Sequence, residues 1–136
     1  MIRDIVTDPF FLGKKSTLAR KSDRYLAQDL KDTLWAHQDH CVGMAANMIG
    51  VNKRVIIIDL GAFDLVMFNP VILTKANPYK SKEACLSLIG YREVRRFDVI
   101  TVSYWDEQWQ PKRLRLTGFE AKICQHEMDH LEGILI

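Results

Sequence analysis

The sequence has no large excess of charge of one sign and no long apolar run. Its 19 basic and 17 acidic residues leave a formal net charge of +2, which is too small to indicate nucleic acid as the main partner. No stretch approaches the roughly 18 apolar residues of a membrane span, and the first residues contain no basic region followed by an apolar run. These absences predict a cytoplasmic protein with no membrane segment and no direct nucleic-acid site.

The sequence also lacks a paired-cysteine motif, an internal repeat, a low-complexity tract and a linker. Its three cysteines, Cys41, Cys85 and Cys124, do not have the C-x-x-C spacing of a structural zinc site. In a reducing compartment we expect them to be thiols or metal ligands. With 136 residues, 48% of them hydrophobic, the chain is predicted to form one domain over residues 1–136.

The most informative stretch contains the pattern H-E-x-x-H, formed by His126, Glu127 and His130. Positions four apart lie on the same face of an α-helix, so the two histidines can aim their imidazoles at one metal ion. Glu127 then lies beside that ion, where its carboxylate can accept a proton from a water molecule. The alternative is a helix with two ordinary histidines and solvated acids.

Local signals predict two helices. Thr117 and Glu120 are typical of a capping box and Gly133 of a helix stop, which together frame the H-E-x-x-H helix. An earlier helix is expected from an N-cap at Ser22 to about Gln38, because leucines recur there every four residues.

Four stretches are expected to be strands because they are β-branched or alternate between apolar and polar residues: 54–60, 65–73, 98–104 and 112–116. The second is expected to be interrupted or edged at Pro70. Residues 1–21 are predicted to form an extended arm, pinned to the core by Phe10, Phe11 and Leu12. Together these elements predict an α+β fold with antiparallel β-sheets around the C-terminal metal-binding helix.

A catalytic metal site usually has three protein ligands, and two histidines leave it one short. Cys85 is one candidate for the third ligand, since a thiolate suits a divalent transition metal. Taken alone, a cysteine in a strand-rich region is more often a small buried apolar residue. The small, apolar segment 41–50 fits either a cleft wall or a tightly packed turn.

Three stretches together resemble the motifs of the peptide deformylase family, G-x-G-h-A-A-x-Q, E-G-C-L-S and Q-H-E-x-D-H-L-x-G, where h is apolar. Here they are segments 41–48, 83–87 and 125–133, and the third is matched in full. The resemblance covers nearly the whole chain. It implies a peptide deformylase-like catalytic domain that removes the N-formyl group from the initiator methionine of nascent polypeptides. The ribosome as a further partner follows from the resemblance alone.

The resemblance also implies the ligands and the chemical groups of the site. Cys85, His126 and His130 would hold one divalent metal ion, most commonly Fe²⁺ with Zn²⁺ or Ni²⁺ as alternatives. Glu127 would transfer the proton to the departing amine, and the backbone N–H of Leu86 would stabilise the oxyanion.

Substrate contacts follow from the same resemblance. Val42 and Gly43 would line the cleft and bond the peptide backbone, and Ile123 would help to form the methionine pocket. Met48 stands where the family has a glutamine that also contacts the oxyanion, and the adjacent Asn47 is an alternative source of that amide. The substitution leaves open a paralogue with weak or lost turnover that binds metal and N-terminal peptides. A zincin-type protease shares H-E-x-x-H but has no evident need for segment 83–87.

Two other family glycines are replaced, by Cys41 and Ala84, which could reshape the cleft. Glu83, Arg96 and Asp129 flank the motifs, and we expect them to form an ion cluster behind the metal ligands. The alternative is three solvated surface charges.

Overall fold

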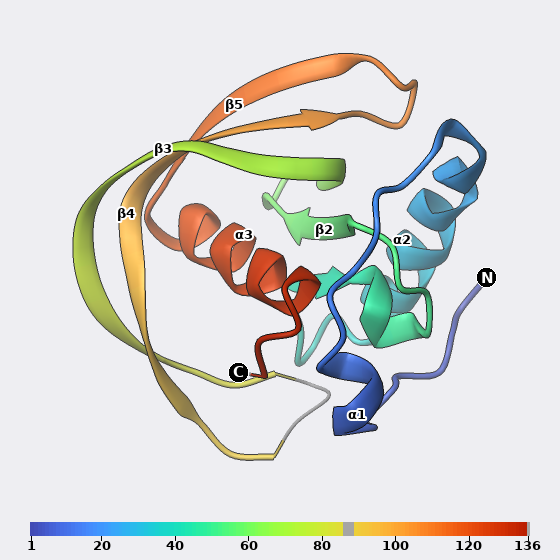
Figure 1. The fold of residues 1–136 in the computed structure, drawn as a ribbon, viewed down its shortest axis with the longest axis horizontal. Helices are drawn as coiled ribbons and strands as arrows, with labels where there is room; N and C mark the ends of the chain where they lie inside the picture. Colours follow the sequence, from blue (N-terminus) through green and yellow to red (C-terminus); the bar gives the residue numbers. More distant parts are fainter. Residues whose placement is uncertain (86–88, 136) are drawn as a thin grey trace.

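A computed structural model describes residues 1–85 and 89–135. Its five strands form one antiparallel sheet in chain order: β1 (Gly43–Ala45), β2 (Val55–Asp59), β3 (Asp64–Glu83), β4 (Arg92–Trp105) and β5 (Pro111–Thr117). The long strands β3 and β4 curve around the C-terminal helix α3 (Gly118–Leu131), as Figure 1 shows. The predicted α+β fold is confirmed.

Strand β3 is much longer than the predicted stretch 65–73. Its pairing with β4 shifts register between Phe68 and Val71, which confirms the irregularity expected at Pro70. Pairing then resumes and continues to Glu83 opposite Arg92. Most side chains of this second half are exposed, so the half lacks the apolar alternation by which a strand is recognised in sequence. Cross-strand hydrogen bonding maintains it instead.

The N-terminal part of the chain differs from the expected arm. A short helix, α1 (Pro9–Leu12), buries Leu12 completely, but Phe10 is 77% exposed and does not pin the arm. Ser22 is not an N-cap. It lies inside a 3₁₀ turn, η1 (Lys21–Tyr25), where the Asp23 carboxylate accepts the Arg20 backbone N–H at 2.7 Å.

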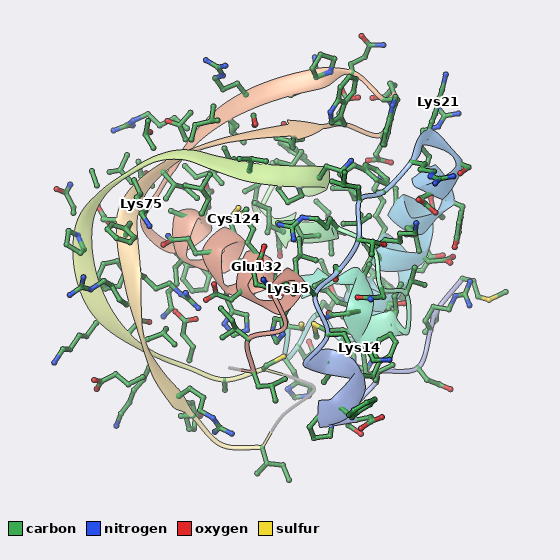
Figure 2. All side chains as sticks on the ribbon, in the orientation of Figure 1. Lys14, Lys15, Lys21, Lys75, Cys124 and Glu132 are labelled. Carbon is green, nitrogen blue, oxygen red and sulfur yellow. The ribbon has the colours of Figure 1, made fainter. Side chains whose placement is uncertain are left out.

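Helix α2 (Leu26–Ala36) follows this turn and buries its leucines against the core. The core lies between α2, strand β2 and helix α3, and residues 55–58 of β2 are completely buried. Cys124 lies on α3 inside the curve of the sheet (Figure 2). Thr117 is the N-cap of α3, but its side chain makes no capping bond, so the predicted capping box does not form. Gly133, with φ of 75°, follows the end of the helix as predicted.

Candidate active site

Helix α3 places both histidines of the H-E-x-x-H pattern in the interior. His126 and His130 are 8% and 0% exposed, and their Nε2 atoms lie 3.2 Å apart. The Nδ1 atom of His126 faces the Glu83 carboxylate at 2.7 Å, so it carries the donated proton and Nε2 is directed toward His130. Both Nε2 atoms therefore face the same space, as two ligands of one ion must.

Cys85 completes this group from the segment that follows β3. It is buried, and its Sγ lies with the two histidine nitrogens so that all three ligand atoms are within 4.8 Å of one another. One thiolate and two imidazoles suit a transition metal in a site with an open position for substrate. The described residues thus fit one metal ion.

The remaining cysteines have other roles. The Cys41 thiol donates to the Gly43 carbonyl at 2.9 Å, and burial, followed by the charge of Glu127, raises its pKa to about 12. Burial likewise raises the pKa of Cys124 to about 12. Both are protonated thiols at neutral pH. No disulfide links the cysteines in the part of the chain that the structure describes.

The predicted ion cluster is present behind His126. Arg96 donates from Nε to Glu83 Oε2 at 2.9 Å, from Nη2 to Glu83 Oε1 at 2.7 Å and from Nη1 to Asp129 at 2.6 Å. Burial opposes the charge on Glu83, but the bonds from His126 and Arg96 outweigh it and lower the pKa of Glu83 to about 2. This carboxylate stays ionised and fixes the orientation of the His126 ring.

The two histidines differ in their protonation. Burial lowers the pKa of His126, but hydrogen bonds with Cys85 and Glu83 outweigh it and raise the pKa to about 10. Burial, followed by the charge of His126, lowers the pKa of His130 to about 3. The proton of the pair is therefore carried by His126, and binding a cation at its Nε2 atom would release that proton.

The Glu127 carboxyl group is buried, and its Oε1 atom has no hydrogen-bond partner among the described residues. Burial raises its pKa to about 7, against a smaller opposing effect of His126. A carboxyl group that titrates near neutrality, beside a metal site, can both accept and deliver a proton.

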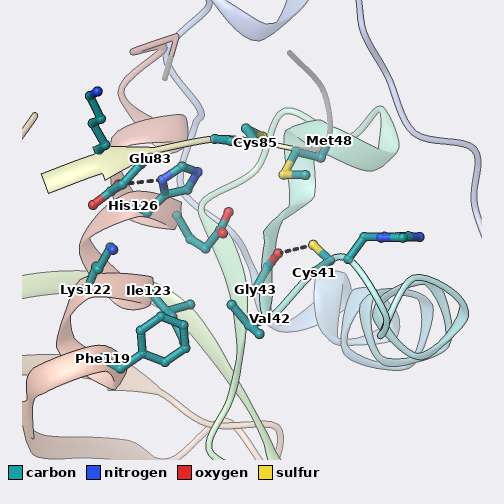
Figure 3. A pocket seen from close by; sticks show the side chains of 14 residues that line it. Cys41, Val42, Gly43, Met48, Glu83, Cys85, Phe119, Lys122, Ile123 and His126 are labelled. Carbon is teal, nitrogen blue, oxygen red and sulfur yellow. Dashed lines mark hydrogen bonds and ion pairs between the residues drawn. The ribbon is translucent and has the colours of Figure 1, made fainter. Parts of the chain in front are cut away.

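A pocket of about 210 Å³ opens beside these groups (Figure 3). It brings together every described residue predicted from sequence for catalysis, metal or substrate except His130, namely Val42, Gly43, Met48, Cys85, Ile123, His126 and Glu127. Leu86 lies outside the described residues. The sequence reasoning missed Phe119 and Lys122, although spacings of seven and four before His126 place them on the same helix face.

Gly43 allows the wall of the pocket to approach the helix closely. A Cβ atom at this position would lie 2.6 Å from Cγ2 of Ile123 and 3.0 Å from Oε2 of Glu127. Strand β1 therefore packs directly on α3 because residue 43 has no side chain.

Met48 lines the pocket, whereas Asn47 points elsewhere. The Met48 sulfur accepts the Ala45 backbone N–H at 3.4 Å. The Asn47 amide donates to the His130 carbonyl at 2.9 Å and is completely buried. The alternative in which Asn47 supplies the missing glutamine amide to the pocket is therefore wrong for this structure.

Comparisons with known proteins agree with this site. A family model described as polypeptide deformylase matches residues 3–136. A curated peptide deformylase of Clostridium beijerinckii is 52% identical over 136 residues, which cover all of both chains. The chain belongs to the peptide deformylase family. A curated peptide deformylase of Aquifex aeolicus is 39% identical, over 98% of this chain and 85% of the relative.

Solved peptide deformylases have the same fold. The Legionella pneumophila structure matches with a TM-score of 0.90 and 32% identity, over 99% of this chain and 83% of that one. The Synechococcus elongatus structure, a complex with actinonin, matches with a TM-score of 0.86 and 33% identity, over 98% and 75%. The chain is thus a metal-dependent hydrolase that removes the N-formyl group from nascent polypeptides, and nothing in these comparisons favours the paralogue with weak turnover. No described helix is long and apolar enough to cross a membrane.

Proposed function

We propose that residues 1–136 form one catalytic domain in which Cys85, His126 and His130 hold a single Fe²⁺ ion, with Zn²⁺ or Ni²⁺ as alternatives. This proposal rests on one observation: the thiol sulfur and the two imidazole nitrogens all lie within 4.8 Å of one another. When bound, the ion acts as a Lewis acid toward the formyl oxygen and the attacking water. Iron is the first choice because of the resemblance to the family, since all three metals tolerate this donor set.

Glu127 is the proposed general base and general acid. Its carboxylate accepts a proton from the attacking water as the oxygen bonds to the formyl carbon. The carboxyl then delivers that proton to the amine nitrogen as the carbon–nitrogen bond breaks, which releases formate and a free N-terminus. Glu127 is only 5% exposed, which limits the competition of bulk water for this proton.

The pocket walls orient the substrate. Strand β1 lies at one end of the sheet order, so Gly43 can offer its backbone on the outer edge to an extended peptide. Val42 lines the same pocket, and its carbonyl accepts the Asp59 N–H on the β2 side. Phe119 and Ile123 supply an apolar surface for the methionine side chain. The Leu86 N–H as oxyanion donor stays a prediction from the resemblance, as do a cytoplasmic location and contact with the ribosome.

Formate release from formyl-Met-Ala-Ser tests the assignment, with protein purified anaerobically in Fe²⁺. We expect turnover in the parent chain and a loss of about 10²-fold or more in Glu127→Ala, because the proton acceptor is removed. Metal content measured on both proteins should be equal. Turnover that survives in Glu127→Ala would contradict the role of this residue. Cleavage of internal peptide bonds in place of formate release would favour a zincin-type protease.

A further inference from the structure

The exposed charges on the wall of the pocket are basic. Lys82, near the end of β3, is exposed, and Lys122 of α3 is half-buried; both line the pocket. The two carboxylates that also line it, Glu83 and Glu127, are each only 5% exposed. The lysines are therefore the charged side chains of this lining that solvent reaches, whereas both acids are buried.

Neither acid offsets the charge at the mouth. Glu83 is paired with Arg96 and His126 on the side away from solvent. Glu127 lies beside the catalytic histidines, and its proposed work is proton transfer at the formyl group. The charge that reaches solvent through the pocket opening is therefore positive.

The neighbours of the two lysines do not hold them in ion pairs. Among the residues that the structure describes, no carboxylate forms an ion pair with either ammonium group. Glu93 is opposite Lys82 across the β3–β4 ladder, but no ion pair of 4.0 Å or less joins them. The Lys122 Nζ atom lies 5.9 Å from the centre of the Phe119 ring, and Figure 3 shows both side chains along the same stretch of α3.

The proposed reaction fixes the direction of the substrate in this pocket. The formyl group must reach Cys85 and the histidines, and the methionine side chain lies against the apolar wall. Each following residue of an extended peptide advances about 3.5 Å, so the first two residues after methionine pass the mouth. We propose that Lys82 and Lys122 select formyl-methionyl peptides with aspartate or glutamate at one of these two positions.

This inference rests on the proposed function and is tested with isosteric peptide pairs. Formyl-Met-Glu-Ser is compared with formyl-Met-Gln-Ser, and formyl-Met-Ala-Glu with formyl-Met-Ala-Gln. We expect kcat/KM to be about fivefold higher for the acidic member of at least one pair, mainly through KM, as is typical of partly exposed charge pairs. The ratio should fall toward one in roughly 0.5 M salt, because screening weakens such attractions.

The Lys82→Gln/Lys122→Gln variant should lower the acidic-to-neutral ratio to about one, and Lys82→Gln alone, at an exposed position, should give an intermediate value. Lys80→Gln is the matched control: it removes the same charge from an exposed site two residues away on β3 that does not line the pocket, and its ratio should equal that of the parent. Acidic-to-neutral ratios of one or less in the parent, or a preference that persists in both lysine variants, overturn the selection. If the glutamine peptides are hydrolysed in that case, deformylation itself stands; if no peptide releases formate, the proposed function fails with it.

Discussion

At the scale of single residues, Met48 stands where the family motif described above has a glutamine. Its thioether lines the pocket beside Cys85 but can donate no hydrogen bond. The sulfur accepts the Ala45 N–H at 3.4 Å. A glutamine oxygen could accept that same N–H and leave the amide N–H groups directed at the pocket.

We therefore expect Met48→Gln to raise kcat for formyl-Met-Ala-Ser by about tenfold or more, because one oxyanion donor is typically worth about 10² to 10³ in rate. Met48→Leu, which adds no donor, is the control and should show no gain. Steady-state formate release from both variants at equal metal content measures the effect. An equal rate for Met48→Gln and the parent would mean that another group already supplies the donor.

Sequence reasoning placed together the residues whose proximity depends on local spacing. His126, Glu127 and His130 lie together because a helix repeats every 3.6 residues. Cys85, a candidate third ligand that the resemblance supported, lies with the two histidines. The partners of Asn47 could not be predicted, because the bond to the His130 carbonyl joins residues 83 positions apart in the chain. Such a contact depends on the packing of two elements, which no local pattern encodes.

At the scale of elements, Asn47 joins the short 3₁₀ helix η2 (Ala46–Ile49) to the last turn of α3. The carbonyl of the proposed ligand His130 accepts the Gly133 backbone N–H at 3.1 Å, and the Asn47 amide adds a second, buried bond to it. The ring of His126 is fixed by Glu83, whereas the Nδ1 atom of His130 has no partner among the described residues. His130 therefore depends on its backbone for position.

We expect Asn47→Ala to weaken metal binding by about tenfold and to lower the free energy of unfolding by about 1 kcal/mol, because one buried hydrogen bond to the His130 carbonyl is lost while the bond from the Gly133 N–H remains. Competition with a chelator measures the affinity, and the absorption spectrum of the Co²⁺-substituted protein reports ligand geometry. Asn52→Ala is the control, because Asn52 also donates to a backbone carbonyl but lies away from the site. An unchanged spectrum and affinity in Asn47→Ala would limit this residue to a purely structural role.

The element boundaries show where sequence patterns lose information. Strand β2 was predicted to within one residue at each end, because all its side chains except Asp59 are buried and most are β-branched. The second half of β3 was missed because its exposed polar residues follow no such pattern. The pairing with β4 that sustains it extends to Glu83, and thereby brings Glu83 and Cys85 to the histidines of α3.

At the scale of the whole molecule, the Glu83–Arg96–Asp129 cluster couples the β3–β4 hairpin to α3 and makes their association depend on pH. The pKa of Glu83 is lowered to about 2 from an ordinary value of 4.5. A carboxyl group with a lowered pKa in the folded state contributes stability that is fully present above the ordinary value. That contribution is lost as the pH falls from about 4.5 toward 2.

This shift corresponds to a contribution of about 3 kcal/mol at neutral pH, and Glu83→Gln should remove most of it. In metal-free protein, the difference in the free energy of unfolding between the parent and Glu83→Gln should therefore be largest above pH 4.5 and should shrink steadily toward pH 2. Urea unfolding across this pH range measures the difference.

The control is Glu93→Gln, which changes an exposed glutamate on β4 and should differ little from the parent at any pH. A difference for Glu83→Gln that stays constant down to pH 2 would show that the cluster contributes through packing and not through the charge of Glu83, because only an ionised carboxylate loses its contribution on protonation.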